Sequence, residues 1–243
     1  MSKTKEIFIE KCDSTQLYAR KLLAAGDVNE KIVIVTEEQT EGKGQGANNW
    51  ISEPEKNLLC SIIYPFKQKA DRQSYISRAV SLALCDLVML FSSEFSVKWP
   101  NDILMNRKKI AGILIEHNIS GAYIQNSVIG IGLNVNQEVF PKGLNAVSLL
   151  HSTGTSFKIK EILHTLLTCI DTRLYLYENR KWEELDNSYH NLLEGYKKEC
   201  NFLLNDGTEF NAINNGIDEF GRIILDINGK MQHYDLNEVH MIL

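Results

Sequence analysis

The first hundred residues contain apolar runs of strand length and two segments with helical periodicity. The apolar runs predict β-strands at 6–12, 31–36 and 58–64. Ser14 or Thr15 could cap a helix that ends near Ala25, and Pro65 is expected to stop the third strand. Apolar residues spaced three and four apart predict a longer helix over residues 73–91.

Farther along, the same patterns predict more strands, at 97–99, 109–116 and 123–133, and more helices, at 159–177 and about 181–195. After Gly195 the turn signals become frequent, at Asn205-Asp206-Gly207, Asn215-Gly216, Gly221 and Asn228-Gly229. We therefore predict a large domain over 1–195 and a small all-β unit over 196–243. The small unit is too short for a stable core of its own and should lean on the large one.

The composition is that of a folded globular protein: 243 residues, 44% hydrophobic and 23% charged. The sequence has no apolar run of about 20 residues and no apolar signal-peptide core after Met1, which favours a cytoplasmic protein. The net charge of −5 disfavours nucleic-acid binding, and the basic cluster Arg107-Lys108-Lys109 is too short to hold a duplex. The five cysteines form neither a zinc motif nor a redox pair.

Between the second and third predicted strands lies a polar loop, Gly42-Lys43-Gly44-Gln45-Gly46, followed by Trp50. Alternating glycines permit positive φ and let backbone N–H groups approach an anion, and Lys43 adds a point charge. The spacing fits neither a Walker A motif nor a dinucleotide fingerprint. The alternative is a mobile surface loop without a ligand, and this pattern alone leaves both open.

The segment Lys98-Trp99-Pro100-Asn101-Asp102 places a rigid Trp-Pro corner beside two polar residues. Bound phosphates would repel Asp102 unless Mg²⁺ lay between them. The alternative, which this segment alone favours, is a turn in which Asn101 and Asp102 bond their own backbone.

Two apolar strands with internal glycines carry the remaining candidates. Lys109 opens the strand that contains Gly112, where a cation at the edge of the core could meet a carboxylate or phosphate. The alternative for this segment is a solvated hairpin tip. Gly130 and Gly132, shortly before Asn134, indicate either a bulge or a ligand that lies on the sheet.

Together and in this order, the four motifs are far more specific than any one of them. From Asp13-Ser14-Thr15 to about residue 151, and most distinctively at 98–102, they resemble the biotin protein ligase family. The resemblance implies an α+β fold, with a mixed β-sheet flanked by helices as in class II aminoacyl-tRNA synthetases. It also implies a small C-terminal all-β barrel like a Src-homology-3 domain. Residues 196–243 match this barrel only in length and in their frequent turn signals.

Members of this family use ATP and Mg²⁺ to activate biotin as biotinyl-5′-adenylate, and then transfer biotin to one lysine of a biotin carboxyl carrier protein domain. The resemblance therefore implies a ligase whose partners are biotin, ATP and that carrier. Carboxylate attack on the α-phosphate brings anions together, so the site needs cations and backbone donors. Polar groups built for the ureido head would be left unpaired by a plain fatty acid, at about 1–3 kcal/mol each.

The resemblance also assigns roles to residues. Lys109 and Lys43 are expected to be catalytic, with Lys109 reaching both the biotin carboxylate and the α-phosphate, and Asp102 is expected to bind the metal. The residues expected to bind biotin are Ser14, Thr15, Gln16, Gln39, Gly42, Lys43, Gly44, Gln45, Lys109 and Gly112. Those expected to bind ATP are Trp50, Lys98, Asn101, Asp102, Gly132 and Asn134.

The chain departs from the family pattern in its loop and at the start of its first helix. Gln45 and Lys43 stand where many members have arginine, and Gln16 replaces a common asparagine. Lys43 keeps the charge but loses the bidentate fork of arginine. Gln45 removes a charge beside the activated intermediate, so we expect the adenylate to be held less tightly.

Some members carry an N-terminal winged helix-turn-helix and act as repressors. Only 12 residues precede Asp13, so we expect a monofunctional ligase without direct DNA binding. Family members use one sheet edge to self-associate or to dock the carrier, and the sequence leaves a homodimer open. The nearest alternative is a lipoate or octanoate ligase or transferase. A non-catalytic binding module is disfavoured by the intact motifs, and a tRNA binder by the charge.

Overall fold

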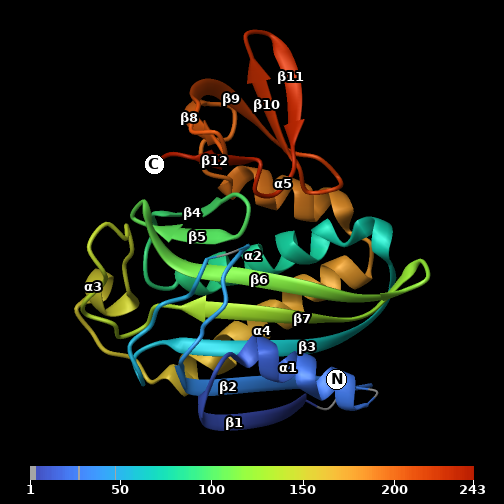
Figure 1. The fold of residues 1–243 in the computed structure, drawn as a ribbon, viewed down its shortest axis with the longest axis vertical. Coiled ribbons are helices and arrows are strands. Elements are labelled where there is room, and N and C mark those ends of the chain that lie inside the picture. Colours follow the sequence, from blue (N-terminus) through green and yellow to red (C-terminus); the bar gives the residue numbers. More distant parts are fainter. Residues whose placement is uncertain (1–3, 27, 47) are drawn as a thin grey trace.

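The computed structural model describes residues 4–26, 28–46 and 48–243, which form two β-sheets with helices packed against the larger one (Figure 1). The larger sheet contains β1 (Thr4–Cys12), β2 (Lys31–Gln39), β3 (Leu58–Lys69), β4 (Phe95–Lys98), β5 (Asp102–Met105), β6 (Lys108–Ser120) and β7 (Tyr123–Leu133). The helices are α1 (Thr15–Ala25), α2 (Ser74–Val88), α3 (Leu149–Thr153), α4 (Ile159–Glu178) and α5 (Trp182–Leu192), with a 3-10 turn at Ala70–Arg72. The smaller sheet contains β8 (Glu199–Leu204), β9 (Glu209–Ile217), β10 (Ile223–Ile227), β11 (Lys230–Tyr234) and β12 (Val239–Met241).

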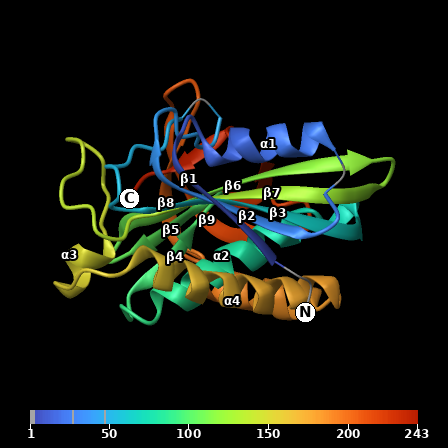
Figure 2. The same cartoon turned by 90° about the horizontal axis from the view of Figure 1, so that it is seen from below.

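The larger sheet is mixed, in the order β1-β2-β3-β7-β6-β5-β4. β1 and β2 run parallel, and the other neighbouring pairs are antiparallel. Figure 2 shows α1 on one face of this sheet and α2 and α4 together on the other. The mixed sheet with flanking helices predicted from the sequence is therefore confirmed.

α1 begins where the sequence predicts, because the side chain of Ser14 accepts a hydrogen bond from the backbone N–H of Gln16 and caps the helix. This cap holds Ser14, Thr15 and Gln16 over the sheet, all of them less than 5% exposed. Across the described ranges of the chain, none of the helices is both long and apolar enough to cross a membrane.

The structure differs from the sequence prediction in several elements. β3 continues through Pro65 to Lys69, because a register shift between Pro65 and Gln68 accommodates the missing backbone N–H. The sequence does not predict β5 or the short helix α3. Asn215-Gly216 is not a turn between strands but lies inside β9, where Gly216 has φ of +95° and packs against the ring of His190.

The smaller sheet is antiparallel, in the order β11-β10-β9-β8-β12. The predicted hairpin at Asn228-Gly229 is confirmed, and both residues have positive φ. β11 and β12 lie at the two edges of the sheet, so the Src-homology-3-like barrel stays a prediction.

A buried cation joins the smaller sheet to the helices beneath it. Arg78 of α2 is 1% exposed, and its guanidinium lies 2.8 Å from Asp186 of α5 and 4.0 Å from the centroid of the Tyr75 ring. The same group donates to the backbone carbonyl of Asp218, just after β9. Buried apolar residues of both sheets also belong to one continuous cluster. The small unit thus packs against the larger one, as expected from its length. The domain boundary at residue 195 stays a prediction.

His190 of α5 makes a second link between the two units. The backbone N–H of Ile217 donates to His190 Nε2 at 3.0 Å, so this nitrogen must be unprotonated. Burial lowers the pKa of His190 below its ordinary value of 6.5; Asp186 raises it, and Arg78 and Lys197 lower it further. The pKa of His190 is lower in the folded state than in the unfolded state. Neutral His190 therefore contributes fully to stability above pH 6.5, and this contribution is lost as the pH falls below 6.5.

His190→Gln is expected to flatten the pH dependence of stability on the acidic side of pH 6.5. Glutamine keeps an acceptor oxygen for Ile217 but does not titrate. Relative to the variant, the wild-type free energy of unfolding should fall by at most about 1.4 kcal/mol per pH unit as the pH is lowered. Urea unfolding at several pH values measures this, and parallel pH profiles for the two proteins would contradict it.

Candidate functional site

A cavity of about 290 Å³ lies where the start of α1, the glycine loop and the paired strands β6 and β7 meet. Most of the residues predicted from the sequence line it: Ser14, Thr15, Gln16, Gln39, Lys43, Gly44, Gln45, Trp50, Lys98, Asn101, Asp102, Lys109, Gly112 and Gly132. These residues come from separate parts of the chain, and the fold brings them to one place.

One end of the cavity is polar and uncharged. The backbone N–H and the hydroxyl of Thr15 both donate to Gln39 Oε1, at 2.8 and 3.1 Å. Ser61 Oγ lies 2.8 Å from Thr15 Oγ1 and 3.1 Å from Gln16 Oε1. Because Thr15 occupies the oxygen of Gln39, the amide nitrogen of Gln39 is left to donate elsewhere. This end suits a neutral group with hydrogen-bond donors and acceptors of its own.

The other end of the cavity is cationic. Lys109 Nζ lies 2.6 Å from Asp102 Oδ1 and 5.6 Å from the centroid of the Trp50 ring. Burial lowers the pKa of Lys98; Lys109 lowers it further, whereas Asp102 raises it. Lys98 and Lys109 thus lie near one carboxylate, Asp102, while Lys43 lines the cavity from the glycine loop, 3.9 Å from Glu41. This end is suited to anions.

A β-bulge turns Lys109 into the cavity. Leu104 of β5 pairs with Lys109 and Ile103 pairs with Ala111, so β6 has one extra residue at this point. As a result, Lys109 Cε lies 3.4 Å from the position that a Cβ on Gly112 would take. The side chain is 31% exposed, and the alternative of a solvated tip is wrong for Lys109.

The motif at 98–102 is also more than a local turn. Asn101 Nδ2 donates to the carbonyl of Ile113 at 2.8 Å, across to β6. Asp102 pairs with Lys109 rather than with its own backbone. Asn101, just before β5, and Asp102, the first residue of β5, therefore both contact β6 at the cavity.

The glycines of β6 and β7 form a seat for Trp50. Gly112 pairs directly with Gly132, and the strand register is unbroken at Gly130 and Gly132, so the bulge expected as one alternative is absent from this part of β7. A Cβ on Gly132 would overlap Cε2 of Trp50, and one on Gly112 would lie 3.0 Å from its Cζ3. The indole therefore lies flat on the two glycines.

The glycine loop folds back on itself. The N–H of Gly44 donates to the carbonyl of Asn48, and the N–H of Trp50 to the carbonyl of Gly42, both at 2.9 Å. A Cβ on Gly42 would lie 2.5 Å from the carbonyl oxygen of Trp50, so only glycine fits this closure. Gly42 is not among the residues that line the cavity, and its contact with biotin stays a prediction.

Asn134 likewise lies behind the wall rather than on it. It is 3% exposed, and its Nδ2 donates to the carbonyl of Val147 at 3.1 Å. Its backbone N–H donates to Ile110 at 2.9 Å. Asn134 thus ties the end of β7 to the segment before α3, and its contact with ATP stays a prediction.

Several residues at the cavity are not among those predicted from the sequence. Ser61 lines it, and the signal for it was a hydroxyl in an otherwise apolar run. Asn237, His240 and Met241 reach it from the smaller sheet, and Asn237 Oδ1 lies 3.6 Å from the Cβ position of Gly46. No local pattern marks these three residues, because their place depends on how the two sheets pack.

Within the described residues, no group of three or more His, Cys, Asp or Glu side chains is arranged to hold a metal ion. Asp102 is the one carboxylate among the described residues that line the cavity. A single carboxylate suits a Mg²⁺ ion that takes its other ligands from phosphates and water, rather than an all-protein metal site.

Gly132→Ala is expected to destabilise the protein by about 1–3 kcal/mol, because the added methyl group overlaps the half-buried Trp50 ring. Urea unfolding measures the loss. Gly26→Ala is the matched control: a Cβ there meets nothing within 4 Å, and its φ of 166° is extended. The control should change stability by less than about 0.5 kcal/mol. Equal effects of the two substitutions would show that the ring does not rest on Gly132.

Known proteins are similar to this chain in sequence. The bifunctional ligase/repressor BirA of Bacillus subtilis is 27% identical, over 91% of this chain and 69% of its own length. The biotin–[acetyl-CoA-carboxylase] ligase of Paracoccus denitrificans is also 27% identical, over 89% of this chain and 92% of its own.

Solved structures agree in fold. The biotin protein ligase from Aquifex aeolicus in complex with biotin and ATP superposes with a TM-score of 0.77 at 24% identity, covering 98% of each chain. The biotin acetyl coenzyme A carboxylase synthetase of Helicobacter pylori, with bound biotinylated ATP, gives 0.60 at 21% identity. Residues 8–134, just over half of the chain, match the Biotin/lipoate A/B protein ligase family. The chain therefore belongs to this family of protein ligases.

Proposed function

We propose that this protein activates biotin with ATP to form biotinyl-5′-adenylate, and then transfers biotin to a lysine of a biotin carboxyl carrier protein domain. The observation that carries the proposal is one cavity with two chemically different ends. The neutral end at Thr15, Gln39 and Ser61 suits the ureido head of biotin. The cationic end at Lys98 and Lys109 suits its carboxylate and the phosphates of ATP.

The chemistry needs two displacements. A carboxylate oxygen of biotin attacks the α-phosphorus of ATP, a P–O bond forms, and pyrophosphate leaves. The lysine amine of the carrier then attacks the acyl carbon, and AMP leaves as the amide forms. In the first step two anions meet, so Lys109 is placed to stabilise the charge that develops between them.

Asp102 Oδ1 lies 2.6 Å from Lys109 Nζ, so the two groups balance each other's charge. When substrate anions enter, they supply the charge that Lys109 needs, and Asp102 becomes available to a cation. Mg²⁺ bound with ATP would then neutralise phosphate charge beside Asp102. Lys98, whose pKa is lowered by burial, stays next to both groups and adds positive charge on the nucleotide side.

Within the part of the chain that the structure describes, the β1 edge of the larger sheet is open to the carrier or to a second copy of the chain. β4 is covered at Val97, which pairs with Leu193 ahead of the smaller sheet. β1 is the opposite edge, and Phe8 on it is 64% exposed. Exposed strand edges pair readily with another chain. We infer that docking of the carrier, or a homodimer, uses β1.

Lys109→Met is expected to lower biotin-dependent exchange of labelled pyrophosphate into ATP by about 10²–10³-fold in kcat/KM, because methionine keeps the length of the side chain and removes its charge. Lys108→Met is the matched control, since Lys108 is the exposed neighbour outside the cavity, and it should stay within about twofold. Full exchange activity in Lys109→Met would exclude the proposed role. Exchange that depends on lipoate or octanoate instead of biotin would favour the other branch of the family.

Gln45→Arg is expected to slow the release of biotinyl-adenylate from the protein. Gln45 lines the cavity in the glycine loop, where an added guanidinium can pair with the phosphate of the adenylate. Pre-formed adenylate, separated from excess substrates, is followed by its rate of dissociation in wild type and variant. Equal release rates would show that position 45 does not control retention.

A further inference from the structure

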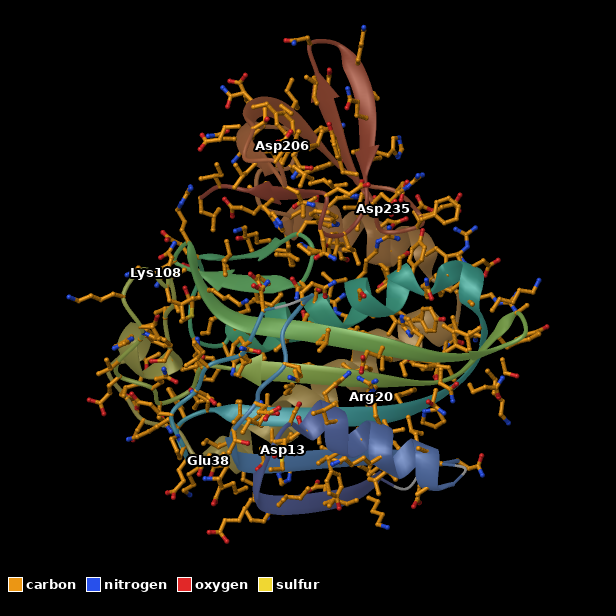
Figure 3. The ribbon with its side chains drawn as sticks, viewed as in Figure 1. Asp13, Arg20, Glu38, Lys108, Asp206 and Asp235 are labelled. Carbon is orange, nitrogen blue, oxygen red and sulfur yellow. The ribbon has the colours of Figure 1, made fainter. Side chains whose placement is uncertain are left out.

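Gln16 is a buried amide that connects the cavity to a carboxylate outside it. Its side chain is among those that line the neutral end, and the residue is 4% exposed. Gln16 Nε2 donates to Glu116 Oε2 at 2.9 Å and to the carbonyl of Val128 at 3.3 Å. Glu116 lies farther along β6, outside the cavity lining, and Arg20 of α1 approaches its other oxygen at 3.3 Å. Figure 3 labels Arg20 on this helix.

These contacts leave the amide of Gln16 only one orientation. An ionised carboxylate and a backbone carbonyl can only accept hydrogen bonds, so the atom that faces them must be the NH₂ group. The oxygen of Gln16 must then face the opposite way, where it lies 3.1 Å from Ser61 Oγ. It occupies the space above Gly130, because a Cβ on Gly130 would lie 2.6 Å from it.

The orientation decides what the cavity offers to a ligand. An amide oxygen has two lone pairs, and Ser61 has one proton to give. Gln16 Oε1 therefore keeps acceptor capacity at the neutral end of the cavity. Gln39 presents the opposite character, because its oxygen is occupied by Thr15 and its nitrogen is left to donate. A cyclic urea, with N–H donors beside a carbonyl acceptor, is complementary to this pair.

We propose that Glu116 is a positioning residue for biotin recognition: it holds the amide of Gln16 so that its oxygen accepts a ureido N–H. The inference rests on the proposed function and extends it to a residue outside the cavity. Glu116 suits this role because Arg20 contacts its other oxygen at 3.3 Å, its side chain is 39% exposed, and among the described residues that line the cavity only Gln16 hydrogen-bonds to its carboxylate.

The test compares Glu116→Gln with Gln16→Met and with the double variant, by biotin-dependent pyrophosphate exchange. A glutamine at 116 has the same shape but can donate as well as accept, so the Gln16 amide is free to turn. Glu116→Gln should raise KM for biotin about tenfold and leave kcat and KM for ATP within about twofold. Glu116→Asp keeps an acceptor-only group, so its KM for biotin should lie between those of the wild type and Glu116→Gln.

The double variant shows whether Glu116 acts through Gln16. Once Gln16 is methionine there is no amide to orient, so Glu116→Gln should add no further increase in KM. Glu178→Gln is the matched control, since this carboxylate also accepts from a neighbouring side chain, Tyr64, but lies away from the cavity. KM is insensitive to the fraction of folded enzyme, so partial unfolding of a variant does not imitate the effect.

An unchanged KM for biotin in Glu116→Gln would overturn the inference while leaving the proposed function intact. A raised KM that is fully additive with Gln16→Met would also overturn it, because Glu116 would then act by another route. A loss of kcat with KM unchanged would place Glu116 in the chemical step instead. A wild-type protein that shows no biotin-dependent exchange would overturn the proposed function itself, and this result is visible before any variant is made.

Discussion

The pairing of β6 with β7 sets Gly112 opposite Gly132, and the site depends on this one register. Two facing glycines leave a hollow on the sheet, which the Trp50 ring fills from the glycine loop. Glycine inside a strand is unfavourable by about 0.5–1 kcal/mol relative to alanine. Burial of the indole offsets that loss, and the same contact anchors the loop that carries Lys43, Gly44 and Gln45 beside the cavity.

Asp102 balances the positive charge at the lysine end of the cavity. Lys98 and Lys109 would repel each other if both faced an empty, low-dielectric space. Asp102 interacts with both lysines. It forms an ion pair with Lys109, and it raises the pKa of Lys98, which burial lowers. The cavity can therefore keep its cations in place before an anion arrives. At the other end the lining groups are neutral: Gln39 accepts from Thr15, Ser61 donates its one proton to Thr15 or to Gln16, and the Gln16 amide donates to Glu116.

The parts of the fold that could be predicted from the sequence are those with local causes. The Ser14 cap, the apolar face of α4 and the Asn228-Gly229 hairpin each follow from neighbouring residues. β5 was missed because a four-residue strand is too short for a period to show. Glu116 was missed because its contact with Gln16 spans 100 residues, and nothing near either residue indicates the other. Asn237 and His240 depend on the packing of a second sheet, which no local pattern encodes.

The spacing of the two ends of the cavity follows from the geometry of one strand. Gly112 and Gly132 carry Trp50 and the stem of Lys109, whereas the next pair on the same face, Leu114 and Gly130, lies under the oxygen of Gln16. Residues two apart in a strand are roughly 7 Å apart on one face. The cationic end and the acceptor end are therefore separated by one repeat of the pleat, a span suited to a single small molecule that is polar at both ends. A slip of one residue between β6 and β7 would put Gly130 and Gly132 on the opposite face from Gly112, so the space for the Trp50 ring and the space for the Gln16 oxygen would be lost together. The recognition of the head group and the placement of the cation are thus consequences of the same backbone pairing.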